Sequence, residues 1–243
     1  MTEHHENVVS EGSVGEVSVV CEGGDMTMFT WLPPSGRGPG IVLIQEIFGV
    51  GDYIRDVAVR LAAAGYVVGA PDVFWRFAPR WAATNDEAGM NASFEQVGKL
   101  DRGLAVKDCV AALGALGNLD AVVGTPGVLG FCLGGTLAWA VALDADPAVC
   151  VSYYGSGVPD MLGSVDAATC PTLFHFGRED AFIPAEGVDR LNAAIDGKPN
   201  FTLNVEIAGH AFDNHRSETF FVEGAAQAAW AKTMAFLGEH LPV

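Results

Sequence analysis

Hydrophobic residues in this chain occur in short continuous runs that alternate with longer segments of helical periodicity. The short runs are typical of strands buried on both faces of a sheet, and the periodic segments are typical of covering helices. Predicted strands span residues 14–20, 26–32, 41–44, 66–70, 128–131, 149–154, 172–176 and 201–207. Predicted helices span residues 53–64, 100–116, 133–143, 185–195 and 223–237. This alternation predicts an α/β fold, with a mostly parallel sheet and helices on both faces.

Two segments do not follow this alternation. Residues 1–13 are polar and are predicted to be a loose N-terminal tail, so that a single domain spans residues 14–243. Residues 74–98 are the least regular part of the chain and combine aromatic side chains with arginines. Such a segment is typical either of a lid or pocket wall, or of ordinary loop packing.

The composition argues against several classes of protein. Half of the 243 residues are hydrophobic, which suffices for a sizeable core. A formal net charge of −17 argues against nucleic-acid binding, because phosphate contacts need cationic side chains. No apolar run reaches about 18 residues and the N-terminus does not resemble a signal peptide, so no membrane association is expected. The five cysteines have no metal-ligand spacing, which favours reduced thiols, a cytoplasmic location and no metal or other cofactor.

The sequence around Cys132 is the most informative motif. Residues 130–135 read Gly-Phe-Cys-Leu-Gly-Gly, which is a Gly-x-nucleophile-x-Gly pattern with cysteine in the place of serine. A predicted strand enters the motif and a predicted helix leaves it, as in a nucleophile elbow. Such a turn exposes the sulfur at a helix N-terminus, where the partial positive charge favours the thiolate. An unpaired cysteine is also commonly just a small buried residue, so the motif needs partners.

Two later residues are the expected partners of Cys132. Asp180 and His210 each follow a predicted strand. Because the carboxyl ends of parallel strands meet at one edge of a sheet, the three side chains are expected to converge, in the order nucleophile, acid, base. The chemistry this predicts is attack of a thiolate on a carbonyl, with His210 moving the proton and Asp180 orienting the imidazole. Glu179 is an alternative acid, and Asp180 alone would also fit a helix cap.

The loop after strand 41–44 holds a further carboxylate. Glu46 directly follows this strand and lies between apolar neighbours. If Glu46 is buried near Cys132, its pKa is raised and it can exchange a proton with the thiol; otherwise it is an exposed loop acid. An oxyanion needs two donors, and the backbone N–H groups of Leu133 and Ile47 are the predicted pair.

Five segments together resemble the dienelactone hydrolase (carboxymethylenebutenolidase) family. They are Gln45-Glu-Ile-Phe-Gly49, Gly130-Phe-Cys-Leu-Gly-Gly135, Tyr153-Tyr-Gly155, Leu173-Phe-His-Phe-Gly177 with Asp180, and Ala208-Gly-His210. The resemblance runs from Gly24 to Leu237 and implies an α/β-hydrolase fold. It also implies hydrolysis of an enol-lactone to maleylacetate in chloroaromatic degradation.

The resemblance assigns roles to individual residues. It implies that Cys132 is the nucleophile, His210 the base, Asp180 the orienting acid, and Glu46 the carboxylate that takes the thiol proton when substrate displaces it. Leu133 and Ile47 correspond to the oxyanion donors. The implied pocket is lined by Phe48, Tyr153, Tyr154, Phe182 and Phe212.

The chain departs from the family at the groups that bind a substrate carboxylate. The family has an arginine four residues after the catalytic histidine, where this chain has Asn214, with Arg216 two residues further on. The family's other carboxylate-binding arginine falls in the segment equivalent to residues 85–98, which contains no arginine here. The candidates for this role are therefore Arg76, Arg80 and Arg216. These departures leave the substrate open while the hydrolytic residues are retained.

The sequence thus predicts a cysteine-dependent hydrolase of a small ester or lactone that acts through an acyl-thiol intermediate. A monomer or a small homo-oligomer is expected. One alternative is a carboxylesterase or thioesterase of another acyl specificity, and a second is a non-catalytic ligand-binding protein of α/β-hydrolase type. A redox-sensing thiol would need a resolving cysteine close to Cys132, which the sequence does not place.

Overall fold

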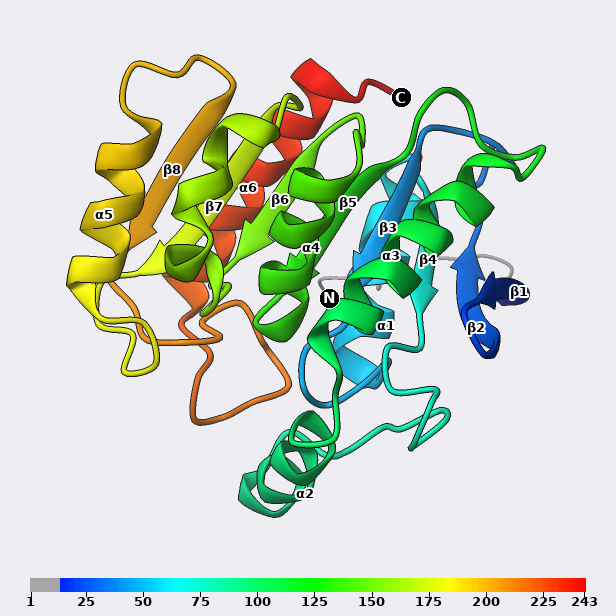
Figure 1. Cartoon of the computed structure of the whole chain (residues 1–243), viewed down its shortest axis with the longest axis horizontal. Coiled ribbons are helices and arrows are strands. Elements are labelled where there is room, and N and C mark those ends of the chain that lie inside the picture. The colour runs from blue at the N-terminus through cyan, green and yellow to red at the C-terminus, as the bar shows by residue number, and fades with distance from the viewer. Residues whose placement is uncertain (1–13) are drawn as a thin grey trace, which may run out of the picture.

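A sheet of eight strands forms the centre of this computed structural model, which describes residues 14–243 (Figure 1). The tail predicted for residues 1–13 lies outside these described residues. The strands are β1 (Val14–Cys21), β2 (Gly24–Trp31), β3 (Gly40–Ile44), β4 (Val67–Pro71), β5 (Gly127–Phe131), β6 (Cys150–Tyr153), β7 (Thr172–Gly177) and β8 (Phe201–Glu206). Their order is β1-β2-β4-β3-β5-β6-β7-β8. The β1–β2 hairpin pairs antiparallel with β4, and all other neighbours are parallel, which confirms the predicted fold class.

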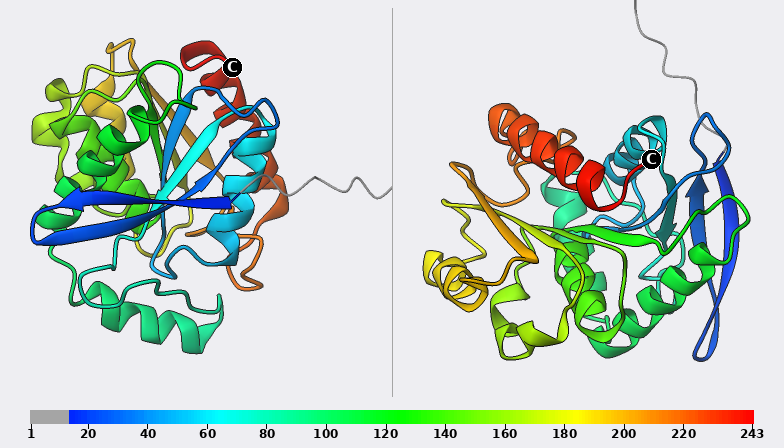
Figure 2. Two further views of the ribbon diagram at one scale, coloured as in Figure 1. Left: turned by 90° about the vertical axis from the view of Figure 1, so that its right-hand side faces the viewer. Right: turned by 90° about the horizontal axis from the view of Figure 1, so that it is seen from above.

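Helices cover both faces of the sheet (Figure 2). One face carries α1 (Asp52–Ala63) and α6 (Glu223–His240). The other face carries α3 (Arg102–Gly117), α4 (Leu133–Asp144) and α5 (Ala185–Ile195). Within the part of the chain that the structure describes, no helix combines the length and the apolar character that crossing a bilayer requires.

Burial on both faces explains why the central strands are uniformly apolar. Every residue of β3, β4 and β5 is buried, so none of these strands alternates polar and apolar positions. By contrast, β8 lies at the edge of the sheet and is mostly half-buried. The largest fully buried side chains include Trp31, Trp139, Phe131, Phe174 and Phe176. The core therefore runs the length of the sheet and holds the carboxyl ends of the strands in fixed positions.

The helix α2 (Glu87–Val97) lies within the segment that showed no regular pattern. Asp86 caps it by accepting a hydrogen bond from the N–H of Gly89 at 2.8 Å. Its interior contains weak helix formers such as Asn91 and Ser93, which hid its periodicity in the sequence. The helix sits apart from both helix layers, beyond the sheet (Figure 1). This placement leaves one of its faces free to line a cavity.

Candidate active site

Cys132 occupies the sharp turn between β5 and α4. Its backbone has φ 53° and ψ −112°, a conformation that costs on the order of 1–3 kcal/mol for a residue with a side chain. The turn also brings backbones unusually close together. A Cβ on Gly134 would lie 2.2 Å from the carbonyl oxygen of Ile44, and one on Gly130 would lie 2.0 Å from that of Gly134, so only glycine fits at either position. The elbow therefore presses against the end of β3 and holds the sulfur at the start of α4.

The structure brings the three residues of the predicted triad together. His210 Nε2 lies 3.0 Å from Cys132 Sγ, and His210 Nδ1 lies 2.7 Å from Asp180 Oδ2. Because a carboxylate only accepts, Nδ1 carries a hydrogen, and Nε2 shares the remaining proton with the sulfur: it accepts from the thiol or, once protonated, donates to the thiolate. The other oxygen of Asp180 accepts from the N–H groups of Phe182 at 2.8 Å and Ile183 at 3.2 Å. These bonds fix the carboxylate, which in turn fixes the tautomer and the orientation of the ring.

The charges around His210 favour its protonated form. Burial by itself lowers the pKa of His210, but the adjacent sulfur of Cys132 and the Asp180 carboxylate outweigh it and raise that pKa to about 10. An imidazole that holds a proton in this position stabilises a thiolate beside it. The arrangement lets His210 hold the proton that a thiol nucleophile must lose.

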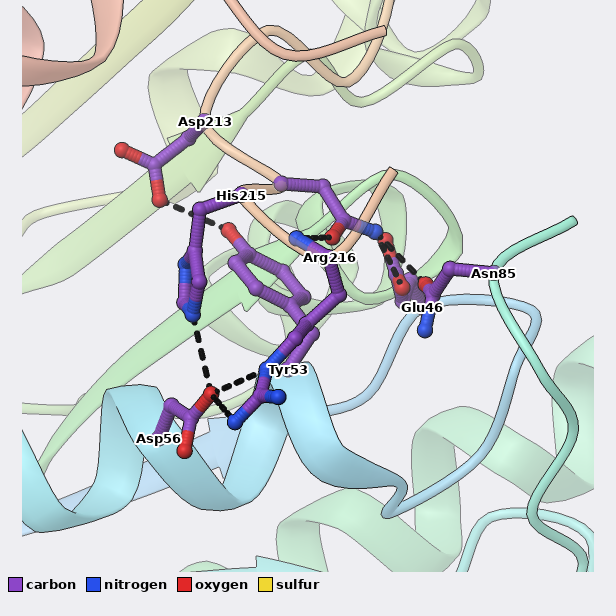
Figure 3. A network of polar contacts seen from close by, with 8 residues as sticks. Glu46, Tyr53, Asp56, Asn85, Asp213, His215 and Arg216 are labelled. Atoms are coloured by element: carbon purple, nitrogen blue, oxygen red, sulfur yellow. Dashed lines mark hydrogen bonds and ion pairs between the residues drawn. The ribbon is translucent and has the colours of Figure 1, made fainter. Parts of the chain in front are cut away.

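Glu46 is buried in the same site, with 2% of its surface exposed. Its Oε1 accepts a hydrogen bond of 2.9 Å from the side-chain amide of Asn214, which also donates to Asn85 at 2.8 Å (Figure 3). Burial raises the pKa of Glu46 to about 8, although the charge of His210 and the amide of Asn214 oppose the shift. The carboxyl therefore holds its proton at neutral pH, and a neutral amide, not a cation, holds the carboxyl.

A cavity of about 380 Å³ opens over the sulfur. This volume is at the small end of the range for ligand sites. One wall is the free face of α2, where Met90, Phe94 and Val97 are spaced to point the same way. Among the residues that the structure describes, the lining consists of Glu46, Ile47, Phe48, Met90, Phe94, Val97, Arg102, Cys132, Leu133, Thr136, Ser156, Gly157, Asp160, Phe182, His210, Ala211 and Phe220. The cavity is thus mainly apolar, with a few polar groups close to the thiol.

The two predicted oxyanion donors, Leu133 and Ile47, both line this cavity beside Cys132. Leu133 is the first residue of α4, and the first amides of a helix have no carbonyl partner within it. Its N–H is therefore available at the elbow. Ile47 follows Glu46 in the loop after β3, so it reaches the same space from the strand next to β5.

The aromatic residues predicted to line the pocket fall into two groups. Phe48 and Phe182 line the cavity, and the ring centre of Phe182 lies 5.0 Å from that of His210. Tyr153, Tyr154 and Phe212 do not line it, because each is fully buried. The Tyr153 hydroxyl lies 2.6 Å from Thr233 Oγ1 on α6, behind the sheet. Tyr154 instead packs directly behind the imidazole, with ring centres 5.2 Å apart.

The three arginines considered for a substrate carboxylate are engaged elsewhere. Their partners lie 2.6–2.7 Å away, and none of the three lines the cavity: the pairs are Arg76 with Asp108, Arg80 with Glu16, and Arg216 with Asp56. This differs from the expectation, because each arginine already has a carboxylate in the folded chain. Among residues 14–243, Arg102 is the arginine or lysine that lines the cavity. The sequence indicates the position of Arg102 only through the preceding residue, Asp101, which is the N-cap of α3. The Asp101 side chain accepts a hydrogen bond of 3.0 Å from the N–H of Leu104.

Comparison with known proteins shows the family of the chain. The model of the family described as "Dienelactone hydrolase family" matches residues 26–241. The chain is 34% identical to a carboxymethylenebutenolidase of a Pseudomonas species, over 91% of this chain and 93% of that protein. It is also 34% identical to a carboxymethylenebutenolidase of Rhodococcus opacus, over 86% of this chain and 84% of that protein. A dienelactone hydrolase-like promiscuous phosphotriesterase from metagenomic libraries shares the fold, with a TM-score of 0.80 at 20% identity, over 96% of this chain and all (100%) of that chain.

Proposed function

The chain belongs to the dienelactone hydrolase family and is thus a hydrolase of ester or lactone bonds, and from this premise we propose that it uses Cys132 to form an acyl-thiol intermediate. The observation that carries the proposal is the separation of 3.0 Å between Cys132 Sγ and His210 Nε2, with Asp180 at 2.7 Å from the other ring nitrogen. Nucleophile, base and orienting acid lie within hydrogen-bond reach, as covalent catalysis requires.

In the first step, the thiolate of Cys132 forms a bond to the carbonyl carbon of the substrate. The carbonyl π pair moves to oxygen, where the N–H groups of Leu133 and Ile47 stabilise the oxyanion. As the carbonyl reforms, the C–O bond of the ester breaks, and the proton held on His210 Nε2 goes to the departing alkoxide. In a lactone this alkoxide stays attached to the acyl group.

In the second step, water replaces the thiol. His210, now neutral, takes a proton from a water molecule whose oxygen bonds to the thioester carbon. The C–S bond then breaks and the thiolate leaves beside the newly charged imidazolium. Asp180 stabilises that charge throughout, because its carboxylate accepts from Nδ1.

Glu46 completes the proposed machinery as a proton-exchanging group. It lines the cavity with Cys132 and has a pKa raised to about 8 by burial. A carboxyl with this pKa can give or take a proton near neutral pH. The family resemblance implies that this carboxylate takes the thiol proton. Because burial keeps Glu46 protonated at neutral pH and the steps above place that proton on His210, Glu46 accepts a proton only in its ionised form, which is populated as the pH approaches 8. Asn214 donates the hydrogen bond that holds the carboxyl in place.

The proposed substrate is a small lactone or ester with an apolar body. A cavity of about 380 Å³ with the apolar side chains of α2 along one wall supports this size and character. The Pseudomonas and Rhodococcus relatives are carboxymethylenebutenolidases, which supports a lactone from aromatic degradation. Five unpaired cysteines support a reducing, cytoplasmic setting.

Rapid acid quenching during turnover of p-nitrophenyl acetate tests the intermediate. We expect one acetyl group per chain, carried on Cys132, because deacylation needs a second proton transfer and lets the thioester accumulate. Mass spectrometry of the digested protein locates the group. An acetyl group on Ser156 or Thr136, which line the same cavity, would contradict the proposal.

Replacing Arg102 with alanine tests whether the substrate carries a carboxylate. We expect kcat/KM to fall about fivefold for a lactone that bears a carboxylate, since an exposed ion pair contributes up to about 1 kcal/mol. The rate with p-nitrophenyl acetate is expected to stay the same. Arg80→Ala is the matched control, because this exposed arginine pairs with Glu16 away from the cavity. An equal fall with both substrates would show that Arg102 does not bind a carboxylate.

A further inference from the structure

A chain of buried polar groups lies behind the catalytic histidine. The Tyr53 hydroxyl lies 2.8 Å from Asp213 Oδ2 and 3.4 Å from the Tyr154 hydroxyl. The three side chains come from α1, from the end of β6 and from the loop after His210, and Figure 3 shows Asp213 above the Tyr53 ring. All three are almost completely buried, with exposures of 1% for Tyr53, 0% for Tyr154 and 2% for Asp213. The mechanism above uses none of them.

The number of available protons gives this chain a direction. A hydroxyl has one proton, and Tyr53 donates its proton to Asp213, because a carboxylate only accepts. Tyr53 therefore accepts from the Tyr154 hydroxyl. The chain runs from Tyr154 through Tyr53 to the Asp213 carboxylate, and Tyr154 also packs against His210 with ring centres 5.2 Å apart.

We propose that Asp213 is a positioning residue that acts through Tyr53 and Tyr154 on His210, and that it favours the protonated imidazole beside the Cys132 thiolate. The proposal rests on the proposed function, in which His210 is the base. The positive charge that forms on the imidazole lies next to a tyrosine ring. The hydroxyl of that ring is polarised toward a carboxylate, and hydrogen-bonded groups of this kind polarise one another in a medium of low dielectric constant.

Titration of Asp213 depends on groups from every element around it. Burial raises the pKa of Asp213 to about 6, while the Tyr53 hydroxyl opposes the shift, so the carboxyl is ionised at neutral pH. The titratable or charged groups that face it are Tyr53 and Arg60 on α1, Tyr153 and Tyr154 at the end of β6, Glu46 after β3, and His215 in its own loop. Within residues 14–243, no cation lies in hydrogen-bond contact with Asp213, so Tyr53 is its partner.

An anchoring role alone does not account for a buried carboxylate here. Neighbouring residues already tie the same loop to the protein: His215 and Arg216 both contact Asp56 on α1, and Asn214 contacts Glu46 (Figure 3). Removing a carboxylate from water is costly, and an apolar pair of similar shape would pack at this position without that cost. The charge itself is therefore the feature that needs a function.

The test follows alkylation of Cys132 by iodoacetamide as a function of pH. The other thiols do not interfere below pH 9, because burial and Asp108 raise the pKa of Cys21 to about 11, and burial raises the pKa values of Cys109, Cys150 and Cys170. Tyr53→Phe removes the middle of the chain and keeps the ring that packs against Phe131. Asp213→Asn keeps an acceptor for Tyr53 and removes the charge. Asp56→Asn is the matched control, because Asp56 anchors the same loop and forms no hydrogen bond with Tyr53, Tyr154 or Asp213.

Tyr53→Phe and Asp213→Asn are each expected to raise the pH midpoint of Cys132 alkylation by about half a unit, because less imidazolium then supports the thiolate. Asp56→Asn should leave the midpoint unchanged. Either substitution interrupts the same series of hydrogen bonds. The double variant Tyr53→Phe/Asp213→Asn should therefore show no larger shift of the alkylation midpoint than either single variant. Its Tm should nevertheless exceed that of Tyr53→Phe, in which a buried carboxylate has lost its donor.

A purely structural role would give a different pattern. In one such pattern, the pH midpoint of Cys132 alkylation would change in parallel with Tm and return toward the wild-type value in the double variant. In the other, the single variants would lower Tm and leave that midpoint unchanged. Either result overturns the proposal. His210→Ala separates this failure from failure of the proposed function: an unchanged midpoint in His210→Ala would mean that the imidazole is not coupled to the thiol, and both proposals would fall.

Discussion

Replacing Cys132 with alanine is expected to reduce kcat/KM for p-nitrophenyl acetate by at least about 10⁴-fold while the protein stays folded. In the proposed mechanism, the substitution removes the atom that bonds to the carbonyl carbon, and neither His210 nor Asp180 can replace it. The remaining rate would come from the oxyanion donors and from binding alone. Alanine keeps the backbone at φ 53° without a new clash, because its Cβ is already part of cysteine. Initial rates and thermal unfolding measure the two parts of this prediction.

The matched control for this experiment is Cys21→Ala. Cys21 is a partly exposed thiol at the end of β1, where its neighbours are Asp108 and Arg76 and not the cavity. This variant should keep full activity. Retention of more than about 1% of the activity by Cys132→Ala would point to a hydroxyl nucleophile, for which Ser156 and Thr136 are the cavity's candidates.

Local sequence patterns predict the fold, and the closeness of Cys132, Asp180 and His210, for a physical reason. A buried parallel strand is apolar throughout, so β3, β4 and β5 are visible as continuous runs. The elbow around Cys132 requires glycines within a few residues of the nucleophile, which a linear motif records. Asp180 and His210 then follow from topology, since parallel strands deliver the residues after them to one edge. The comparisons confirm the family, and the roles of these residues stay proposals.

Contacts between distant parts of the chain do not leave a local signal. The sequence makes Arg76 a candidate for binding a substrate carboxylate, but in the fold Arg76 pairs with Asp108, 32 residues away. The Tyr53–Asp213 bond joins positions 160 residues apart, and neither residue stands in a motif. Arg102 lines the cavity because α3 starts there, which depends on where α2 ends in space. Such features need coordinates, because the sequence fixes neither the partner of a charged side chain nor its direction.

Sequence patterns also do not predict how side chains at the ends of strands are oriented. Tyr153 and Tyr154 are adjacent, and neither faces the cavity: the hydroxyl of one lies near Thr233, and the ring of the other packs behind His210. Successive residues of a strand point to opposite faces, so two adjacent tyrosines rarely share a site. The backbone of Tyr154 has φ 37°, a turn that the pattern of the sequence does not reveal.

Replacing His210 with alanine is expected to lower kcat/KM at pH 7 by about 10³-fold, which corresponds to roughly 4 kcal/mol of transition-state stabilisation. In the wild-type protein, burial lowers the pKa of His210, but Cys132 and Asp180 outweigh it and raise that pKa to about 10, so in the proposed mechanism the imidazole holds the proton that the thiol gives up. Without it the thiol must ionise unaided, as a free cysteine does near about pH 8.5. The kcat/KM of the variant should therefore rise with pH through that region, and its deficit relative to the wild-type protein should narrow.

The leaving group decides how far the deficit of His210→Ala narrows at high pH. p-Nitrophenolate leaves without a proton, so in the acylation of the variant by p-nitrophenyl acetate, the step that kcat/KM reports, only the support of the thiolate is missing; the base for deacylation is missing too and affects kcat. An alkyl lactone releases an alkoxide that needs the proton from Nε2, and its deficit should persist at every pH. His215→Ala is the matched control, because this histidine lies in the same loop and contacts Asp56 at 2.9 Å. An equal loss in His215→Ala, or a deficit that is the same at every pH with both substrates, would show that the loop is perturbed and that His210 does not act as the base.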